Sequence, residues 1–197
     1  MKEKRVCQHG IPLLGARVGD FWAWAYSDIL NNTDRATFAE FVVGTAFCVT
    51  DAPREEWDAV DLRYGDKTVE VKSSAYVQSW HREQDPPSIG SFDLKERLSR
   101  DVSTNAYRIE PSRAADCYVF CVYAEKVRRI ANILDVEKWE CFVISTEQIN
   151  WRLGSQRTAA FSPVRGRQGL SRTEERGSRN GTAGALVGRD LGGSDAA

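Results

Sequence analysis

The alternation of hydrophobic and polar residues over residues 57–74, WDAVDLRYGDKTVEVKSS, predicts two short strands around a tight turn. The segment YGDK at 64–67 supplies the turn, because Gly and Asp tolerate the positive φ that two-residue hairpin loops need. This turn predicts five cross-strand pairs: Tyr64 with Lys67, Arg63 with Thr68, Leu62 with Val69, Asp61 with Glu70, and Val60 with Val71. A one-residue slip would bring Asp58 rather than Asp61 towards Glu70, so the register is a testable prediction.

The predicted hairpin carries like charges on one of its faces. Side chains alternate across a strand, so Asp61, Glu70 and Lys72 share one face, while Val69 and Val71 share the opposite, better-buried face. Two carboxylates directly opposite each other destabilise a sheet. Two interpretations are open: a solvated face on which Lys72 neutralises Glu70, or a site for a divalent cation whose charge removes the repulsion.

A helix is predicted from about residue 34 to 47, and it contains an unexpected carboxylate. The stretch FAEFVVGTAF at 38–47 is apolar almost all round, which is typical of a buried helix, yet Glu40 lies within it. A buried carboxylate needs compensation. The alternatives are a raised pKa, an ion pair with an arginine such as Arg35 or Arg63, or a metal held by the hairpin.

The rest of the chain predicts further elements around this centre. An aromatic-rich helix is expected at 20–30, with its aromatic side chains in the core. Residues 116–124 and 140–145 are apolar on both faces and predict buried strands, which indicates an α/β protein. A helix is favoured around 94–100, within the most basic part of the folded region.

Length and composition indicate how many domains the 197 residues form and where the protein is located. We expect one domain over residues 1–161, since 42% hydrophobic residues suffice for a core. Residues 162–197 are rich in Gly, Arg and Ser and predict a flexible tail. No apolar segment suggests a signal peptide or a membrane span, so we expect a cytoplasmic protein without membrane contact. A net charge of −1 indicates no general affinity for nucleic acid, but it leaves room for a local basic rim.

The order of these elements, with a glutamate in the helix, an aspartate in the first strand and Glu-x-Lys in the second, resembles the PD-(D/E)xK nuclease superfamily. The matching residues are Glu40, Asp61 and the run Glu70-Val71-Lys72. The phrases DFWAWAYSDIL, RATFAEFVV, EEWDAVDL, VEVKSSAYVQSW and DCYVFCVYA resemble, within that superfamily, a family of uncharacterised bacterial proteins, over about residues 15–150. No proline precedes Asp61, as in many superfamily members.

The resemblance implies a fold and a site. The implied fold is a restriction-endonuclease-like αβββαβ core, with a mixed central sheet flanked by helices. Asp61 and Glu70 would bind Mg²⁺, with Mn²⁺ as the other candidate, and the Val71 carbonyl would add a ligand. Lys72 would orient water or stabilise negative charge. Glu40 would support a second ion or orient water.

The resemblance also implies a function, which is metal-dependent hydrolysis of phosphodiester bonds. Nucleic acid, and DNA in particular, is the expected partner, and a homodimer is compatible with cutting two strands. Gln78 is a further candidate for the rim of the site. One alternative is a noncatalytic DNA-binding or assembly module that retains the fold. Another is a structural protein in which the hairpin charges only pair with each other.

Overall fold

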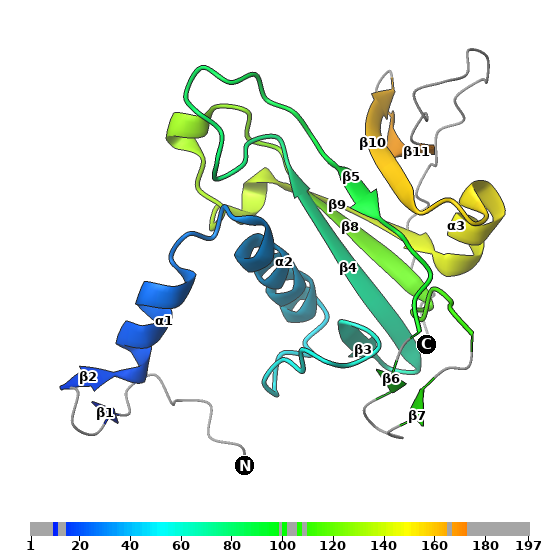
Figure 1. Cartoon of the computed structure of the whole chain (residues 1–197), viewed down its shortest axis with the longest axis horizontal. Helices are drawn as coiled ribbons and strands as arrows, with labels where there is room; N and C mark the ends of the chain where they lie inside the picture. Colours follow the sequence, from blue (N-terminus) through cyan, green and yellow to red (C-terminus); the bar gives the residue numbers. More distant parts are fainter. Residues whose placement is uncertain are drawn as a thin grey trace, which may run out of the picture.

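A mixed four-stranded sheet forms the centre of the protein, with a helix on one face and a second, smaller sheet on the other (Figure 1). The structure is a computed structural model that describes residues 10–11, 15–98, 100–101, 106–107, 110–164 and 167–172. The expected α/β class with a mixed central sheet is therefore confirmed. Within the described residues, no helix is long and apolar enough to cross a bilayer.

The central sheet has the strand order β3-β4-β8-β9. Its strands are β3 (Leu62–Tyr64), β4 (Lys67–Ala75), β8 (Cys117–Tyr123) and β9 (Trp139–Ser145). β4 runs parallel to β8, and the two outer pairings are antiparallel. The two strands expected at 116–124 and 140–145 are thus present, and β8 is central and buried on both faces, as its sequence predicts. The expected burial of the second strand is wrong, because β9 lies at the edge of the sheet and only its Ile144 is buried.

Helix α2 (Asn32–Ala46) covers one face of this sheet. Its N-terminus is capped by the Asn31 side chain, whose Oδ1 accepts hydrogen bonds from the backbone N–H groups of Thr33 and Asp34. The helix places Ala39 and Val43 against Val69 and Val71 of β4, together with residues of β8. Burying this apolar contact fixes α2 on β4, so the direction in which Glu40 projects is set by core packing.

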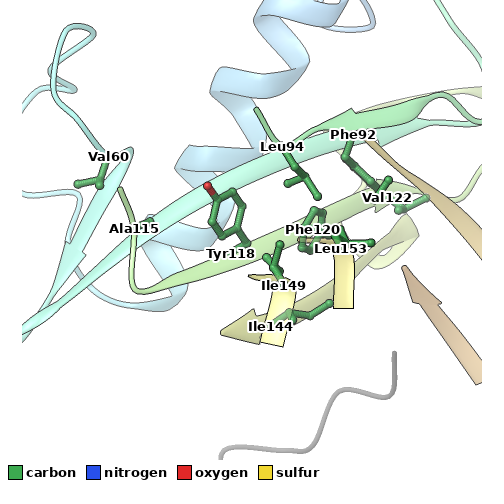
Figure 2. Packing of buried hydrophobic residues seen from close by; sticks show 11 residues of the cluster. Val60, Phe92, Leu94, Ala115, Tyr118, Phe120, Val122, Ile144, Ile149 and Leu153 are labelled. Carbon is green, nitrogen blue, oxygen red and sulfur yellow. The ribbon is translucent and has the colours of Figure 1, made fainter. Parts of the chain in front are cut away.

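The opposite face is covered by α3 (Thr146–Leu153) and by a three-stranded sheet with the order β11-β10-β5. These strands are β5 (Ser91–Asp93), β10 (Thr158–Val164) and β11 (Arg167–Arg172). Figure 2 shows the core between the layers, whose largest members are Phe92, Leu94, Tyr118, Phe120, Ile144, Ile149 and Leu153. Beside this core lies a cavity whose wall includes Glu70, Lys72 and Tyr118.

The predicted hairpin register is confirmed for the three pairs that form the β3–β4 ladder, Tyr64 with Lys67, Arg63 with Thr68 and Leu62 with Val69. Gly65 has a φ of +59° at the first loop position. Among the loop residues only Gly65 has a positive φ, which is the pattern of a type II′ turn, so Asp66 does not need the conformational freedom expected of it.

The N-terminal helix departs from the sequence prediction. α1 (Val18–Tyr26) follows a short pairing of β1 (Gly10–Ile11) with β2 (Ala16–Arg17), and Figure 1 shows these elements apart from the central sheet. No residue of α1 is buried, and Trp24 is 84% exposed. The expectation that its aromatic side chains belong to the core is therefore wrong.

The crossover between β4 and β8 also differs from expectation. None of the described residues in the range 94–100 is helical, contrary to the helix favoured there, and the chain forms a bridge between Arg97 and Ser112. Two short strands, β6 (Arg100–Asp101) and β7 (Ala106–Tyr107), complete the crossover. Two 3₁₀ helices, η2 (Arg128–Ile130) and η3 (Val136–Lys138), connect β8 to β9.

The expected domain boundary at residue 162 falls inside β10. β10 and β11 pair in an antiparallel hairpin, so regular structure extends through Arg172. The part of the predicted tail at 173–197 lies outside the described residues, as do 165 and 166.

Candidate metal centre

The site is built at an open edge of β4. β3 pairs with β4 only as far as Val69, so beyond that residue no described strand covers this edge. The N–H of Val71 instead donates to Oδ2 of Asp61, at 2.7 Å. Because the N–H and C=O of one residue lie on the same edge of a strand, the Val71 carbonyl faces the same side. The backbone thereby fixes the Asp61 carboxylate beside the expected ligand carbonyl.

Asp61 lies in a strongly negative environment. The pKa of its carboxyl group is raised from 3.8 to about 7, first by burial and then by the negative charges of Glu70 and Glu40. The hydrogen bond from Val71 and the charge of Lys72 lower this pKa and so oppose the rise. Three carboxylates therefore interact electrostatically at one place: Asp61 just before β3, Glu70 on β4 and Glu40 on α2.

The alternative register with Asp58 is excluded. Asp58 binds Arg63 through three hydrogen bonds, the shortest being 2.9 Å, and it also caps the backbone N–H of Ala59. Asp61, by contrast, interacts with Glu70. The predicted choice of Asp61 over Asp58 is confirmed.

Glu70 and Lys72 form an ion pair on one face of β4. Nζ of Lys72 lies 2.5 Å from Oε1 of Glu70, and their side chains are 26% and 21% exposed. This ion pair agrees with the interpretation of a solvated hairpin face. The partial burial of the two side chains does not agree with it, because both lie in the wall of a cavity rather than in open solvent.

Glu40 projects from α2 and is only 8% exposed at its side chain. Its partner is Arg54, whose Nε donates to Oε2 and whose Nη2 donates to Oε1 at 3.1 Å. The two arginines considered from the sequence are engaged elsewhere: Arg35 binds Gln78 and Arg63 binds Asp58. Arg54 lies in the loop before β3, where no periodic pattern indicates which residues meet.

The donors suit a hard divalent cation, although their present arrangement is not that of a formed metal site. In the described part of the chain, no three His, Cys, Asp or Glu side chains are grouped so as to hold a metal ion. Glu40 and Glu70 are each turned towards a cationic side chain. Carboxylate and carbonyl oxygens are nevertheless the ligands that Mg²⁺ and Mn²⁺ prefer, and Oδ1 of Asp61 accepts no hydrogen bond from the described residues.

Two cavities meet at this centre. A cavity of about 520 Å³ lies beside Glu70 and Tyr118, and one of about 440 Å³ lies beside Glu40 and Gln78. Both are lined by the same three residues, Asp61, Lys72 and Asp93. A third cavity, of about 690 Å³, lies between α2 and the loop before β3 and also reaches Glu40 and Asp61. The carboxylates are thus accessible from both sides.

Gln78 has a different position from the rim that was expected. It is 7% exposed, its Oε1 accepts a hydrogen bond from Arg35 at 2.8 Å, and its Nε2 donates to the carbonyl of Ala75 at 2.8 Å. It borders the 440 Å³ cavity, with its amide engaged by the protein.

Sequence reasoning missed three residues around the site, Arg54, Trp57 and Trp80, whereas Lys95 lies in the segment identified from the sequence as the most basic part of the folded region. The two tryptophans are 80% and 63% exposed, and each borders one of the two cavities. Both lie in segments of mainly polar residues, and an isolated tryptophan among polar residues is a signal that could have identified them. Comparison of the chain with models of protein families, with curated proteins and with solved structures gave no match. The superfamily resemblance stays a prediction.

Proposed function

We propose that this protein is a metal-dependent nuclease that hydrolyses phosphodiester bonds, with DNA as the substrate. The observation that carries this proposal is the Asp61 carboxylate, fixed by the N–H of Val71 and surrounded by the charges of Glu70 and Glu40. A like-charge cluster is unfavourable in the free protein and becomes favourable when a divalent cation binds. Carboxylates whose pKa values are perturbed by burial and neighbouring charges in a cavity are typical of functional sites.

We also propose that the fold is the restriction-endonuclease-like αβββαβ core. In support, α2 precedes the β3–β4 hairpin, Glu40 projects from α2, and Glu70 and Lys72 lie on β4. A departure is the crossover from β4 to β8, whose described residues contain short strands and no helix. The correspondence with the proposed fold rests on β4, which contains Glu70-Val71-Lys72, and on β8, which runs parallel to it.

In this proposal Asp61, Glu70 and the Val71 carbonyl hold Mg²⁺ or Mn²⁺, and Glu40 supports a second ion or orients water. When bound, the cation supplies positive charge at the phosphoryl oxygens and lowers the pKa of water. Lys72 then exchanges its ion pair with Glu70 for contact with the attacking water or the phosphate. Its ammonium group is the one positive charge that β4 presents between the two cavities.

The residues then have separate tasks in hydrolysis. The oxygen of water attacks phosphorus, the bond from phosphorus to the leaving oxygen breaks, and that oxygen takes up a proton. Asp61 and Glu70 would hold the cation, which would lower the pKa of the attacking water so that its proton passes to solvent, and solvent would supply the proton to the leaving oxygen. Lys72 stabilises the negative charge that develops on the phosphoryl group.

A cleavage assay tests the proposal. Purified protein should cut labelled DNA with Mg²⁺ or Mn²⁺ and stop in EDTA, and Lys72→Ala should lose roughly 100-fold or more of the rate. Lys67→Ala is the matched control, because Lys67 lies on the same strand but pairs with Asp66 at the exposed turn. Cleavage that persists in both Asp61→Ala and Glu70→Ala would contradict the proposal.

One observation favours the noncatalytic alternative, a DNA-binding or assembly module. Glu40 and Glu70 are already paired with the side chains of Arg54 and Lys72, as expected for a protein in which these carboxylates no longer bind a metal ion. That module would bind DNA equally well with and without divalent ions. A binding isotherm recorded in EDTA and in Ca²⁺ separates the two functions.

A further inference from the structure

Arg35 is a buried cation without an anionic partner among the described residues. It is 3% exposed, and its guanidinium donates only to neutral acceptors: the Leu30 carbonyl, Oε1 of Gln78 and Oδ1 of Asn32. Its Nε is buried without any hydrogen bond. Burial lowers the pKa of Arg35 to about 10, and no nearby carboxylate opposes this effect. A buried charge left in this state costs stability.

A second buried arginine shows what a purely structural role looks like in this protein. Arg113 has a side chain that is 1% exposed, and a carboxylate, Glu96, lies 3.7 Å from it. Its guanidinium is also surrounded by acceptors: the carbonyls of Leu94, Gly154 and Gln156, and Oδ1 of Asn150. Each of its three nitrogens donates. Arg35 differs in both respects, so its charge calls for an anion that the described residues do not supply.

The cavity beside Arg35 has the features of a nucleotide site. Arg35 lines the 440 Å³ cavity together with Lys72 and Trp80. Trp80 is 63% exposed and borders this cavity, so a planar ligand in the cavity can reach its indole. A volume of this size falls within the range of sites that hold one small organic molecule.

The cavity on the other side of the carboxylates repeats this combination. Trp57 is 80% exposed and lines the 520 Å³ cavity together with Lys95. Arg97 lies there too, but its guanidinium is already bound to Asp93 at 2.6 Å. Because Asp61 and Lys72 line both cavities, each tryptophan borders a cavity that reaches the candidate metal centre.

We propose that the two cavities bind a single, unpaired nucleic-acid strand, with one base stacked on Trp57, another on Trp80, and phosphates beside Lys95 and Arg35. This inference rests on the proposed function and names its substrate class. Aromatic side chains that bind single strands stack on the faces of bases, which are inaccessible in a base-paired duplex. The strand would cross Asp61 and Lys72, so the bond between the two stacked nucleotides lies at the carboxylates.

A binding measurement in EDTA tests this proposal without requiring cleavage. Fluorescence anisotropy of a labelled twelve-nucleotide strand, poly(dT), would be compared with a twelve-base-pair hairpin duplex. We expect the single strand to bind at least about 10-fold more tightly. Trp57→Ala and Trp80→Ala should each weaken single-strand binding by roughly 5-fold or more, the usual effect of one stacking residue.

Trp151→Ala is the matched control. Trp151 is also 80% exposed, but it lies on α3 and lines neither of the two cavities. Its variant should bind within about twofold of the parent protein, because a stacking effect should be confined to the tryptophans at the cavities. Equal losses in all three variants would overturn the proposal, because they would indicate nonspecific contact.

Arg35→Gln tests the phosphate contact. Arg35 also ties α2 to Gln78, so its loss lowers stability, and the variant is measured at a temperature where thermal unfolding shows it folded. The slope of log affinity against log salt should fall in magnitude by about 0.7, the value for one phosphate contact on a single strand. Lys67→Gln, outside both cavities, should not change it. An unchanged slope in Arg35→Gln would remove Arg35 from the proposal.

The failure of this proposal and of the nuclease proposal are distinguishable. Metal-dependent cleavage that is insensitive to Trp57→Ala and Trp80→Ala would overturn the proposed path of the single nucleic-acid strand. It would leave the nuclease proposal intact. Tryptophan-dependent binding of the single strand without cleavage in any metal would support the path and contradict the nuclease. Tighter binding of the duplex than of the single strand would overturn the path directly.

Discussion

The two faces of β4 differ although their residues alternate along one strand. Val69 and Val71 point towards α2 and are 2% and 5% exposed, in a closed apolar layer. Glu70 and Lys72 point the other way and border a cavity. The same backbone therefore serves packing on one face and holds charges on the other. The strand can keep an unfavourable set of charges because the opposite face supplies the stability.

This contrast predicts that substitutions on the two faces separate activity from stability. Lys72→Ala gives the largest expected effect, a loss of roughly 100-fold or more in cleavage rate, because the charge that faces the substrate is removed. Its unfolding free energy should fall by only about 1 kcal/mol, because Glu70 is left without its partner in a partly exposed position. Cleavage rate and thermal unfolding, measured on the same preparation, check this. A stable variant with the parental rate would mean that the charged face has no catalytic task.

Val69→Ala should show the opposite behaviour. Removing two methyl groups from a side chain that is 2% exposed leaves a cavity between β4 and α2, which costs about 2 kcal/mol. Urea unfolding measures this loss. The cleavage rate below the unfolding transition should change little. A loss of activity with unchanged stability would contradict the division between the faces.

Asp61→Asn should stabilise the protein at high pH. Because the pKa of Asp61 is raised from 3.8 to about 7, the folded state holds a proton that the unfolded state has lost between these values. Stability from this group is present below pH 3.8 and falls as pH rises to about 7. The variant should therefore match the parent protein near pH 3.5, where Asp61 is protonated in both states, and exceed its midpoint by about 4 °C or more at pH 8.

The same substitution sharpens the metal assignment. Mg²⁺ should raise the thermal midpoint of the parent protein more at pH 8 than at pH 5, because protons and the cation compete for the same carboxylates. Asp61→Asn should lose this response. A midpoint difference between the two proteins that does not depend on pH would contradict the raised pKa.

Arg54→Ala should give the smallest of these effects. Arg54 is 39% exposed at its side chain, so its loss is partly compensated by water, while Glu40 is left without its partner. We expect a loss of about 1 kcal/mol of unfolding free energy, and recovery of part of it in the double variant with Glu40→Gln. Chemical denaturation of both variants checks this. Equal stability of Arg54→Ala and the parent protein would show that Glu40 needs no counterion.

The hairpin and the charges on it were predictable because they depend on local chemistry. Gly65 at the turn sets the register, and the period of two then determines which face receives Glu70 and which receives Val71. Glu40 was also predictable, since one carboxylate in an apolar helix stands out. A further local signal was overlooked: Ser145 and Gln148 have the spacing of a capping box, and Ser145 does cap α3.

The remaining features depend on contacts between distant segments. The pairing of β5 with β10 joins residues 91–93 to 158–160, and no local pattern specifies it. The partner of Glu40 comes from an irregular loop, at Arg54. The aromatic pattern of α1 predicts a helix, but periodicity does not distinguish a core helix from one whose aromatic side chains stay exposed.

The central claim is that Asp61 and the charged face of β4 form a metal centre. Diffraction from crystals soaked in Mn²⁺, recorded at the manganese absorption edge, tests it most directly. We expect an anomalous peak within coordination distance of Asp61, Glu70 and the Val71 carbonyl, with Lys72 displaced from Glu70. The absence of any peak there at saturating Mn²⁺, in crystals of a protein that cleaves DNA in solution, would contradict it.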